Sequence, residues 1–195
     1  MIVSLETLKG QFLIAMPNMG DTRFEKTVIY VCAHSCEGAM GFVVNKTLEA
    51  PSPSDFLCQL NIIGEAERKT LPAALQNSLL YSGGPVEPGR GFVLHSPDYA
   101  AETTLVVDDA ISMTATLEIL RAISLGNGPK QAFIALGYSG WAAGQLEEEI
   151  GSNGWLTCSA DASLVFDHDQ ETKYHRALRG MGINPLLLSA QAGHA

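Results

Sequence analysis

Apolar positions along the chain gather in short runs that glycine, proline and small polar residues separate. Runs without polar alternation are typical of strands that are covered on both faces. The pattern predicts strands over residues 10–16, 27–33, 39–44, 79–82, 91–95, 103–107, 131–136, 155–158 and 163–166.

A smaller part of the chain carries the spacing of helices. Leu117 and Leu120 mark one side of a predicted helix that Gly126 ends, because glycine readily takes the left-handed conformation of a helix C-cap. The stretch 61–78 has no readable pattern and is predicted to be mostly surface loop. The predicted helices span residues 55–60, 113–125, 142–150 and 170–181.

The number and order of these elements indicate a fold class. Strands outnumber helices and come in groups, without regular alternation of strand and helix, which favours α+β over a doubly wound sheet. The 195 residues, 46% of them hydrophobic, suffice for one packed domain, which we place over residues 1–188. Residues 189–195 are small and polar and are predicted to form a disordered tail.

The charge balance limits the classes of partner. The chain has 12 Lys and Arg against 21 Asp and Glu, a formal net charge of -9. Such a field repels phosphate backbones and anionic membrane surfaces unless basic residues cluster. The best basic stretch, Lys173, His175, Arg176 and Arg179, lies in the predicted helix over 170–181. Direct nucleic-acid binding and membrane binding are therefore disfavoured.

Location and redox state are inferred from the first residues and from the cysteines. Residues 1–10 lack the basic start, the uninterrupted apolar stretch and the cleavage site of a secretory signal. No apolar run in the sequence approaches the ~20 residues of a membrane-spanning helix. We therefore predict a cytoplasmic protein whose cysteines stay reduced. These are Cys32, Cys36, Cys58 and Cys158.

Three groups of short motifs are distinctive in combination. They are Pro17-Asn-Met-Gly-Asp21 with the segment from Phe24 to His34 and Gly38-Ala-Met-Gly-Phe-Val-Val-Asn45-Lys46, Ser82-Gly-Gly-Pro-Val86 with His95, and Gly137-Tyr-Ser-Gly-Trp141 with Gly144-Gln-Leu-Glu147 and Trp155. Together they resemble the AlgH/YqgE family of bacterial proteins over nearly the whole chain. The resemblance implies a single α+β domain with a small closed β-sheet barrel flanked by helices.

The same resemblance says little about activity. The family is usually labelled as a transcriptional regulator, yet it has neither a known DNA-reading motif nor an established reaction. The cysteines are not part of the family pattern, and residues 61–78 are where this chain is expected to differ from its relatives.

Cys32, His34 and Cys36 stand two residues apart and would share one face of an extended strand. Such ligands could hold zinc. No second Cys or His pair at finger-like spacing follows in the sequence, and free cysteine is among the residues most often buried. Ordinary packing is therefore favoured, and no metal or cofactor is predicted.

Ser139 lies between a predicted strand and a predicted helix, which is the context of a nucleophile elbow. That motif needs a second glycine where Trp141 stands, and the bulky indole would crowd the turn. His168 and Asp167 lie downstream, but no ordered pair of histidine and acid can be assigned. A hydrolase is kept only as an alternative, and no catalytic residue is assigned.

Other candidates lie in a turn and at strand ends. Gly83 and Gly84 could turn backbone N–H groups toward an anion, but the turn contains a proline and no helix start follows, so a structural turn is favoured. His34, Asn45 and His95 each end a predicted strand, where sites are common. For each histidine, a role as a structural hydrogen-bond partner is favoured over ligand binding.

Trp141, Gln145 and Glu149 share one helical stripe by their i, i+4 spacing. The neighbouring stripe, with Leu146 and Ile150, is predicted to face the core, which places the first stripe at the border with solvent, where a cleft wall would lie. Plain packing at this border is about as well supported as ligand contact. We expect the Trp141 ring to bury one face and to open the other to a cleft.

The favoured hypothesis is a binding or regulatory protein with a pocket for a small molecule or a protein partner. The alternatives are a transcriptional regulator that contacts DNA directly and an uncharacterised hydrolase-like enzyme. The candidate binding residues are His34, Asn45, Gly83, Gly84, His95, Trp141, Gln145 and Glu149.

Overall fold

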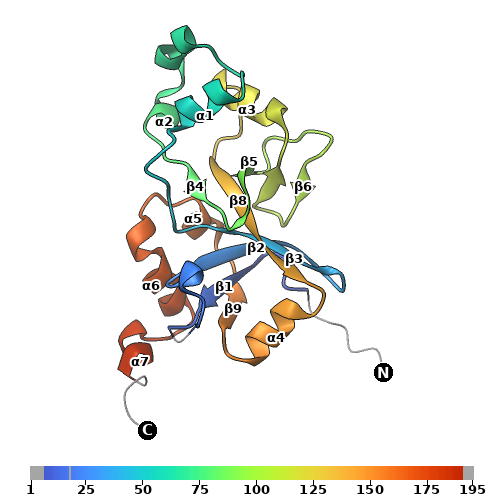
Figure 1. Ribbon diagram of the computed structural model, residues 1–195, viewed down its shortest axis with the longest axis vertical. Helices are drawn as coiled ribbons and strands as arrows, with labels where there is room; N and C mark the ends of the chain where they lie inside the picture. The colour runs from blue at the N-terminus through green and yellow to red at the C-terminus, as the bar shows by residue number, and fades with distance from the viewer. Residues whose placement is uncertain (1–6, 18, 191–195) are drawn as a thin grey trace. The chain divides into compact units, whose positions relative to one another are not determined.

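The computed structural model describes residues 7–17 and 19–190, and this part of the chain divides into two units. Unit 1 holds the described residues up to Asn45 and those from Ser139 onward, whereas unit 2 is Lys46–Tyr138. Both units combine helices with mainly antiparallel strands, which confirms the α+β class (Figure 1). The extent of a single domain over residues 1–188 stays a prediction.

Unit 1 is built on an antiparallel sheet in the order β8–β3–β2–β1–β9. Its central strand β2 (Val28–Ser35) pairs with β1 (Gln11–Ala15) on one side and with β3 (Gly38–Val43) on the other. β9 (Trp155–Ser159) pairs with the free side of β1, and the last residues of β8 (Ala132–Ala142) pair with β3. Consecutive strands β1, β2 and β3 are therefore neighbours in the sheet.

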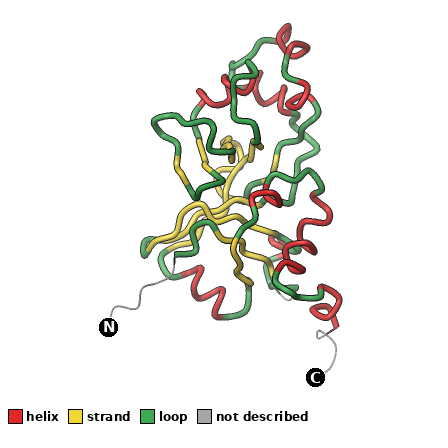
Figure 2. The backbone as a smooth tube through the Cα atoms, turned by 180° about the vertical axis from the view of Figure 1, so that it is seen from behind, coloured by secondary structure: helices red, strands yellow, loops and turns green. Residues whose placement is uncertain are grey.

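Helices pack against different strands of this sheet, and this explains its apolar runs. α4 (Gln145–Gly151) contacts β3 and β9, and its Leu146 joins a buried cluster with Leu13 and Trp155. α6 (Gln170–Gly180) contacts β1 and β2 instead (Figures 1 and 2). Successive side chains of a strand point to opposite faces, and consecutive positions of β1 and β2 are buried. Both faces of these two strands are therefore covered. The other helices of unit 1 are η1 (Thr22–Phe24), α5 (Ala162–Val165) and α7 (Pro185–Ala190).

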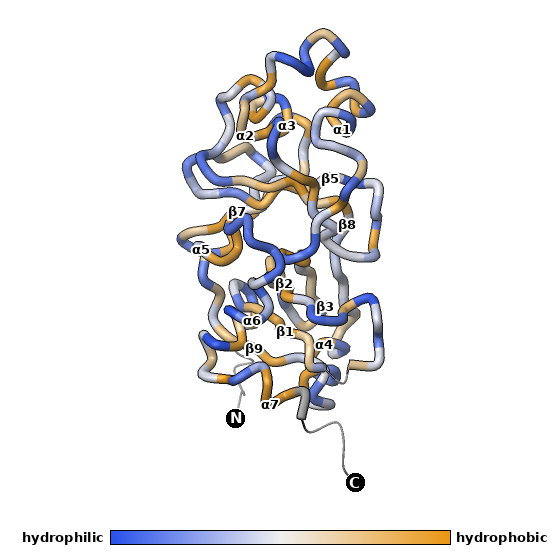
Figure 3. Tube along the Cα trace, turned by 90° about the vertical axis from the view of Figure 1, so that its left-hand side faces the viewer, coloured by the Kyte–Doolittle hydropathy of each residue, from blue (hydrophilic) through white to orange (hydrophobic). Residues whose placement is uncertain are grey.

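Unit 2 packs short helices against a second group of strands. Its elements are α1 (Pro53–Gln59), η2 (Glu65–Thr70), α2 (Ala73–Gln76), β4 (Tyr81–Ser82), β5 (Val86–His95), β6 (Leu105–Val106), β7 (Ser112–Thr114) and α3 (Leu117–Ser124). The strands follow the antiparallel order β6–β7–β5–β8, and β4 lies parallel to β8. The core joins Phe56 and Leu57 to Ile119 and Leu136. Orange stretches in Figure 3 mark the hydrophobic residues of β5 and β8.

The sheet is open, so the predicted closed barrel is wrong. Closure requires a neighbour on both sides of every strand. Within the described residues, β9 pairs only with β1 in unit 1, and β6 pairs only with β7 in unit 2. The edge strand β6 has just two residues, which offers little backbone for a further pairing.

β8 corrects the predicted break between a strand over residues 131–136 and a helix that begins at residue 142. The structure has one strand, Ala132–Ala142, and α4 begins only at Gln145. Gly137 takes a φ of +73°, which bends the strand without ending it. A Cβ added at Gly137 would lie 2.5 Å from the carbonyl oxygen of Gly84. The glycine therefore allows a close backbone approach inside a strand.

Other differences concern short apolar segments. Residues 163–166 were predicted as a strand, but most of them form α5, because the Asp161 carboxylate caps a helical turn there. Residues 113–114 belong to β7, so the predicted helix begins only at Leu117. Residues 61–78 contain η2 and α2, which the missing periodicity did not reveal.

The end of the described chain is helical. α7 reaches Ala190, so the start of the tail predicted over 189–195 is part of a helix. Residues 191–195 of that tail lie outside the described residues. Among the helices of the described chain, none is long and apolar enough to cross a membrane.

We predict that Gly137→Ala lowers the free energy of unfolding by about 3 kcal/mol. The new Cβ combines a left-handed backbone, about 1–2 kcal/mol, with crowding against the Gly84 carbonyl, about 1–3 kcal/mol. Gly144 is the matched control, since its φ is +77° and nothing lies within 4 Å of an added Cβ. Gly144→Ala should lower the free energy of unfolding only by the cost of the left-handed backbone, about 1–2 kcal/mol. Denaturant unfolding measures both variants, and equal losses would show that the contact with Gly84 is not responsible.

Candidate functional site

The candidate binding residues are shared between the two units. Unit 1 holds His34, Asn45, Trp141, Gln145 and Glu149, and unit 2 holds Gly83, Gly84 and His95. Trp141, Gln145 and Glu149 come together, but they do not form the predicted helical stripe, because Trp141 belongs to β8 and not to the helix.

Glu149 forms the centre of this group. Its Oε2 accepts the indole N–H of Trp141 at 2.9 Å and that of Trp155 at 2.8 Å, while its Oε1 accepts the Gln145 amide at 2.9 Å. The two indole rings pack edge to face at 6.1 Å. Trp141 is only 7% exposed, so the predicted open face of its ring is wrong. The group fixes α4 against β8 and β9 and leaves no cleft wall at Trp141.

His34 is held from both sides of its ring. The backbone N–H of Leu8 donates to Nδ1 at 3.0 Å, so Nε2 carries the hydrogen and donates to Glu147 Oε1 at 2.8 Å. The Glu147 backbone N–H and then the His34 ring lower the pKa of the Glu147 carboxyl. His34 therefore links β2 to α4, which is a structural role.

His95 is fully buried in unit 2 and belongs to an internal network. Its Nδ1–H donates to the Ser96 carbonyl at 2.8 Å, and its Nε2 lies 2.8 Å from Thr114 Oγ1. Thr114 Oγ1 in turn hydrogen-bonds with Thr104 Oγ1 at 2.8 Å. Burial holds the pKa of His95 below its usual value, although the bond to Ser96 raises it. A neutral structural histidine accounts for this arrangement.

The remaining motif residues support backbone structure. The N–H of Gly83 donates to the Leu136 carbonyl at 2.9 Å, so the sheet uses a donor that the alternative, an anion-binding turn, would need. Ser139 is 1% exposed inside β8, whereas a nucleophile elbow presents its serine on an exposed turn. Cys32 is buried and Cys36 is exposed, and the described chain contains no group of three or more His, Cys, Asp or Glu side chains placed to hold a metal.

Asn45 fixes an unusual backbone conformation beside the start of β2. Its Oδ1 accepts the N–H of Val28 at 2.9 Å, and its Nδ2 donates to the carbonyl of Lys26 at 2.8 Å. Lys26 has a φ of +50°, a left-handed conformation that is uncommon for a lysine. Asn45 therefore positions Lys26 through the backbone.

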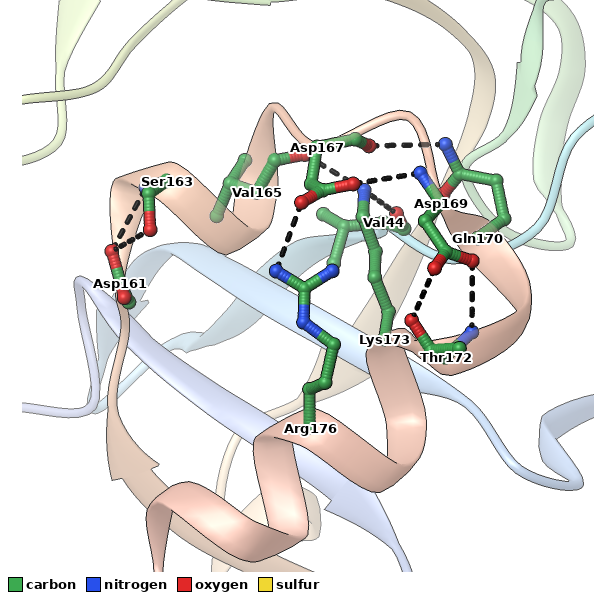
Figure 4. Close-up of polar contacts among 10 residues, drawn as sticks. All are labelled: Val44, Asp161, Ser163, Val165, Asp167, Asp169, Gln170, Thr172, Lys173 and Arg176. Carbon is green, nitrogen blue, oxygen red and sulfur yellow. Dashed lines mark hydrogen bonds and ion pairs between the residues drawn. The ribbon is translucent and has the colours of Figure 1, made fainter.

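The basic helix of the sequence, now α6, turns its first cation inward. Lys173 is 0% exposed, and its ammonium donates to the carbonyls of Val44 at 2.7 Å and Val165 at 3.0 Å (Figure 4). Burial lowers the pKa of Lys173 to about 8, although the nearby Asp167 carboxylate opposes this shift. Lys173 therefore joins α6 to the chain after β3 and to the end of α5.

Two further contacts fix α6. The Tyr174 hydroxyl donates to the Ala15 carbonyl at 2.6 Å, which ties the helix to β1. The Arg176 guanidinium pairs with Asp167 at 2.9 Å and lowers the pKa of that carboxyl (Figure 4). The orientation of α6 in unit 1 is therefore determined by consecutive internal contacts.

A cavity of about 340 Å³ lies beside this fixed helix. We call it the α6–α7 cavity, because both helices contribute to its wall. Its apolar lining consists of Pro17, Tyr174, Leu178, Pro185, Leu186 and Leu188. Its polar lining consists of Glu25, Lys26, His175, Arg179 and Asn184. All of these residues belong to unit 1.

Two cations at this cavity have no partner among the described residues. Neither the Lys26 ammonium nor the Arg179 guanidinium makes a hydrogen bond or an ion pair with other residues of the described chain. Both side chains are exposed, and His175 stands one turn before Arg179 on α6. The cavity therefore combines an apolar wall with two cations that pair with none of the described residues.

Reasoning from the sequence missed this cavity. The sequence shows the basic stretch but not which of its side chains face inward. Lys173 faces inward because its ammonium bonds to Val44 and Val165, and periodicity does not reveal such contacts. The segment 185–190 was not predicted to be helical, although Pro185 at its first position is a common helix start. That proline was the one available signal.

Comparison of the sequence with known proteins gives a consistent result. A family model described as AlgH-like matches residues 12–186. A UPF0301 protein of Rhizobium etli is 54% identical over 202 residues, which cover 99% of this chain and 100% of that relative. A UPF0301 protein of Beijerinckia indica is 56% identical and covers 96% of this chain and 92% of that relative.

Solved structures show the same similarity. The solution structure of the AlgH protein from Pseudomonas aeruginosa has a TM-score of 0.79 at 42% identity and covers 98% of both chains. A crystal structure of a protein from Corynebacterium diphtheriae has a TM-score of 0.69 at 20% identity, over 97% of this chain and 93% of that one. The second similarity shows a shared fold alone.

We predict that Trp141→Ala lowers the free energy of unfolding by about 3–5 kcal/mol, the loss typical of truncating a buried aromatic residue. Leu146→Ala, in the same cluster, is the control for core truncation and should cost about 2–5 kcal/mol. Denaturant unfolding of both variants provides the comparison. A loss near ~1 kcal/mol at Trp141 alone would restore the open ring face that the sequence suggested.

We predict that wild-type protein gains stability relative to Lys173→Met between pH 8 and 10.5. The folded state releases the Lys173 proton near pH 8, whereas the unfolded chain keeps it until about 10.5, so the unfolded state binds more protons in this window. The difference in unfolding free energy should rise by about 3 kcal/mol. A neutral amine still has two N–H donors for the two carbonyls.

Denaturant unfolding across this pH range measures the difference, because other titrating groups are common to both proteins. Lys69→Met, at an exposed lysine, is the control and should show no such trend. A constant difference between wild type and Lys173→Met would contradict a lowered pKa of Lys173.

Proposed function

We propose, from the premise that the chain belongs to the AlgH-like family, that it is a binding protein that holds a small molecule in the α6–α7 cavity. The observation that carries this proposal is the cavity, with its apolar wall and its two cations that have no partner in the described part of the chain. Small-molecule sites commonly combine an apolar lining with a few placed polar groups. A volume of about 340 Å³ lies at the lower end of their usual range.

The proposed site replaces the pocket expected around Trp141 and Glu149, which bond to each other instead. From the candidate binding residues we retain Asn45 as a positioning residue, because it holds the backbone of Lys26. For His34 and His95 we propose structural roles, since both ring nitrogens of each make internal hydrogen bonds.

Direct contact with DNA is the weaker alternative. DNA binding requires basic side chains that reach phosphates. On α6, Lys173 is buried and Arg176 pairs with Asp167, which leaves His175 and Arg179 at the surface. If the chain acts in transcription, we propose that it does so in the cytoplasm through its ligand or a protein partner.

The proposal is tested with a metabolite library and a thermal unfolding assay on the full chain. A ligand that binds only the folded state stabilises it by about 2.7 kcal/mol at 100 times its Kd. Leu186→Glu should abolish the stabilisation, because Leu186 lines the cavity and a carboxylate there adds charge to its apolar wall. A library without any stabilising compound would contradict the proposal.

Leu187→Glu is the matched control. Leu186 and Leu187 are neighbours in α7 and are 77% and 66% exposed, so neither substitution removes core packing. Leu187 does not line the cavity, so its variant should keep the wild-type response. An equal loss in both variants would place the ligand elsewhere. Sequence-specific, salt-sensitive retention of DNA in a gel shift would favour the regulator alternative instead.

A further inference from the structure

The rim of the α6–α7 cavity has a charge opposite to that of the whole chain. The chain carries a formal net charge of -9. At the cavity, Lys26 and Arg179 stand against one carboxylate, Glu25, so positive charge is in excess even with His175 neutral. A local positive field on an acidic protein attracts anions to the cavity and repels cations from it.

The cavity wall requires an apolar body in the ligand. Tyr174 lines the cavity, its hydroxyl donates to the Ala15 carbonyl, and the residue is only 6% exposed. Leu178, from the next turn of α6, is 1% exposed, so the accessible apolar wall is formed by Pro17 and Leu186. Leu186 is 77% exposed and lines the same cavity, so a ligand with an apolar tail would cover surface that water now contacts.

The kind of anion follows from the number and chemistry of the charged groups. A guanidinium presents paired N–H donors that match the two oxygens of a carboxylate. A phosphate dianion would bring a second negative charge, which Glu25 opposes. One excess positive charge therefore suits a ligand with one negative charge.

We infer that the α6–α7 cavity binds an organic monocarboxylate with an apolar tail, whose carboxylate lies at Lys26 and Arg179 and whose tail lies against the exposed side chains of Pro17 and Leu186. This inference rests on the proposed function and adds the class of ligand. Asn45 supports it as a positioning residue, because it holds Lys26 in its left-handed conformation beside the cavity.

The test uses four probes on the full chain: octanoate, 1-octanol, octylammonium and acetate. Backbone amide shifts of residues 25–26, 174–184 and 186–188 report binding at this cavity, and titration gives each Kd. Octanoate should bind about tenfold more tightly than octanol and octylammonium, since two exposed cations together contribute about tenfold. Acetate, which lacks the tail, should bind more weakly still.

The double variant Lys26→Gln with Arg179→Gln should lose about tenfold in octanoate affinity and keep its octanol affinity. Lys69→Gln with Arg121→Gln removes the same charge from exposed positions outside the cavity and should leave both affinities unchanged. Equal losses in the two double variants would show a general charge effect and overturn the inference. Asn45→Asp, which replaces the amide donor, should weaken octanoate binding and shift the Lys26 amide signal.

Failure of the inference and failure of the proposed function give different results. If octanol and octylammonium bind at these amides as tightly as octanoate, the cavity binds small molecules but does not select a carboxylate, and only the inference is overturned. If none of the probes shifts these amides and no library compound stabilises the protein, both are overturned.

Discussion

The buried ammonium of Lys173 is the contact on which the arrangement of unit 1 depends. It joins α6 to the carbonyls of Val44 and Val165, which belong to segments far apart along the chain. An ammonium removed from water is costly unless its protons have acceptors, and two carbonyls at the ends of other elements supply them. Tyr174, the next residue, bonds to the Ala15 carbonyl, so two successive side chains of α6 determine its orientation.

This fixed orientation separates the roles of the basic residues on α6. Lys173 lies inside, and Arg176 pairs with Asp167 in the loop before the helix. Arg179 remains available at the cavity, together with Lys26 from a backbone that Asn45 holds. A helix that resembles a basic patch in the sequence is therefore mainly an internal support, and its remaining charge borders one cavity.

Residues that carry the family resemblance have structural roles in this chain. Gly137 permits β8 to pass close to the Gly84 carbonyl, and Trp141 shares the carboxylate of Glu149 with Trp155. Asn45 anchors the start of β2. Such residues identify a fold because its backbone depends on them, whereas they do not specify a reaction. Membership of the AlgH-like family is therefore compatible with a site built from less distinctive residues.

The sequence by itself determined the α+β class, the strands β1 to β3 and the acidic charge, because periodicity and composition depend on local or additive properties. Helical spacing accounts for Gln145 and Glu149, whereas Trp141 reaches Glu149 from β8. Only the tertiary structure decided that the sheet stays open, that β8 continues past Gly137, and that Lys173 points inward. The physical reason is separation along the chain: Lys173 and its acceptor Val44 are 129 residues apart, and burial is decided by such distant partners.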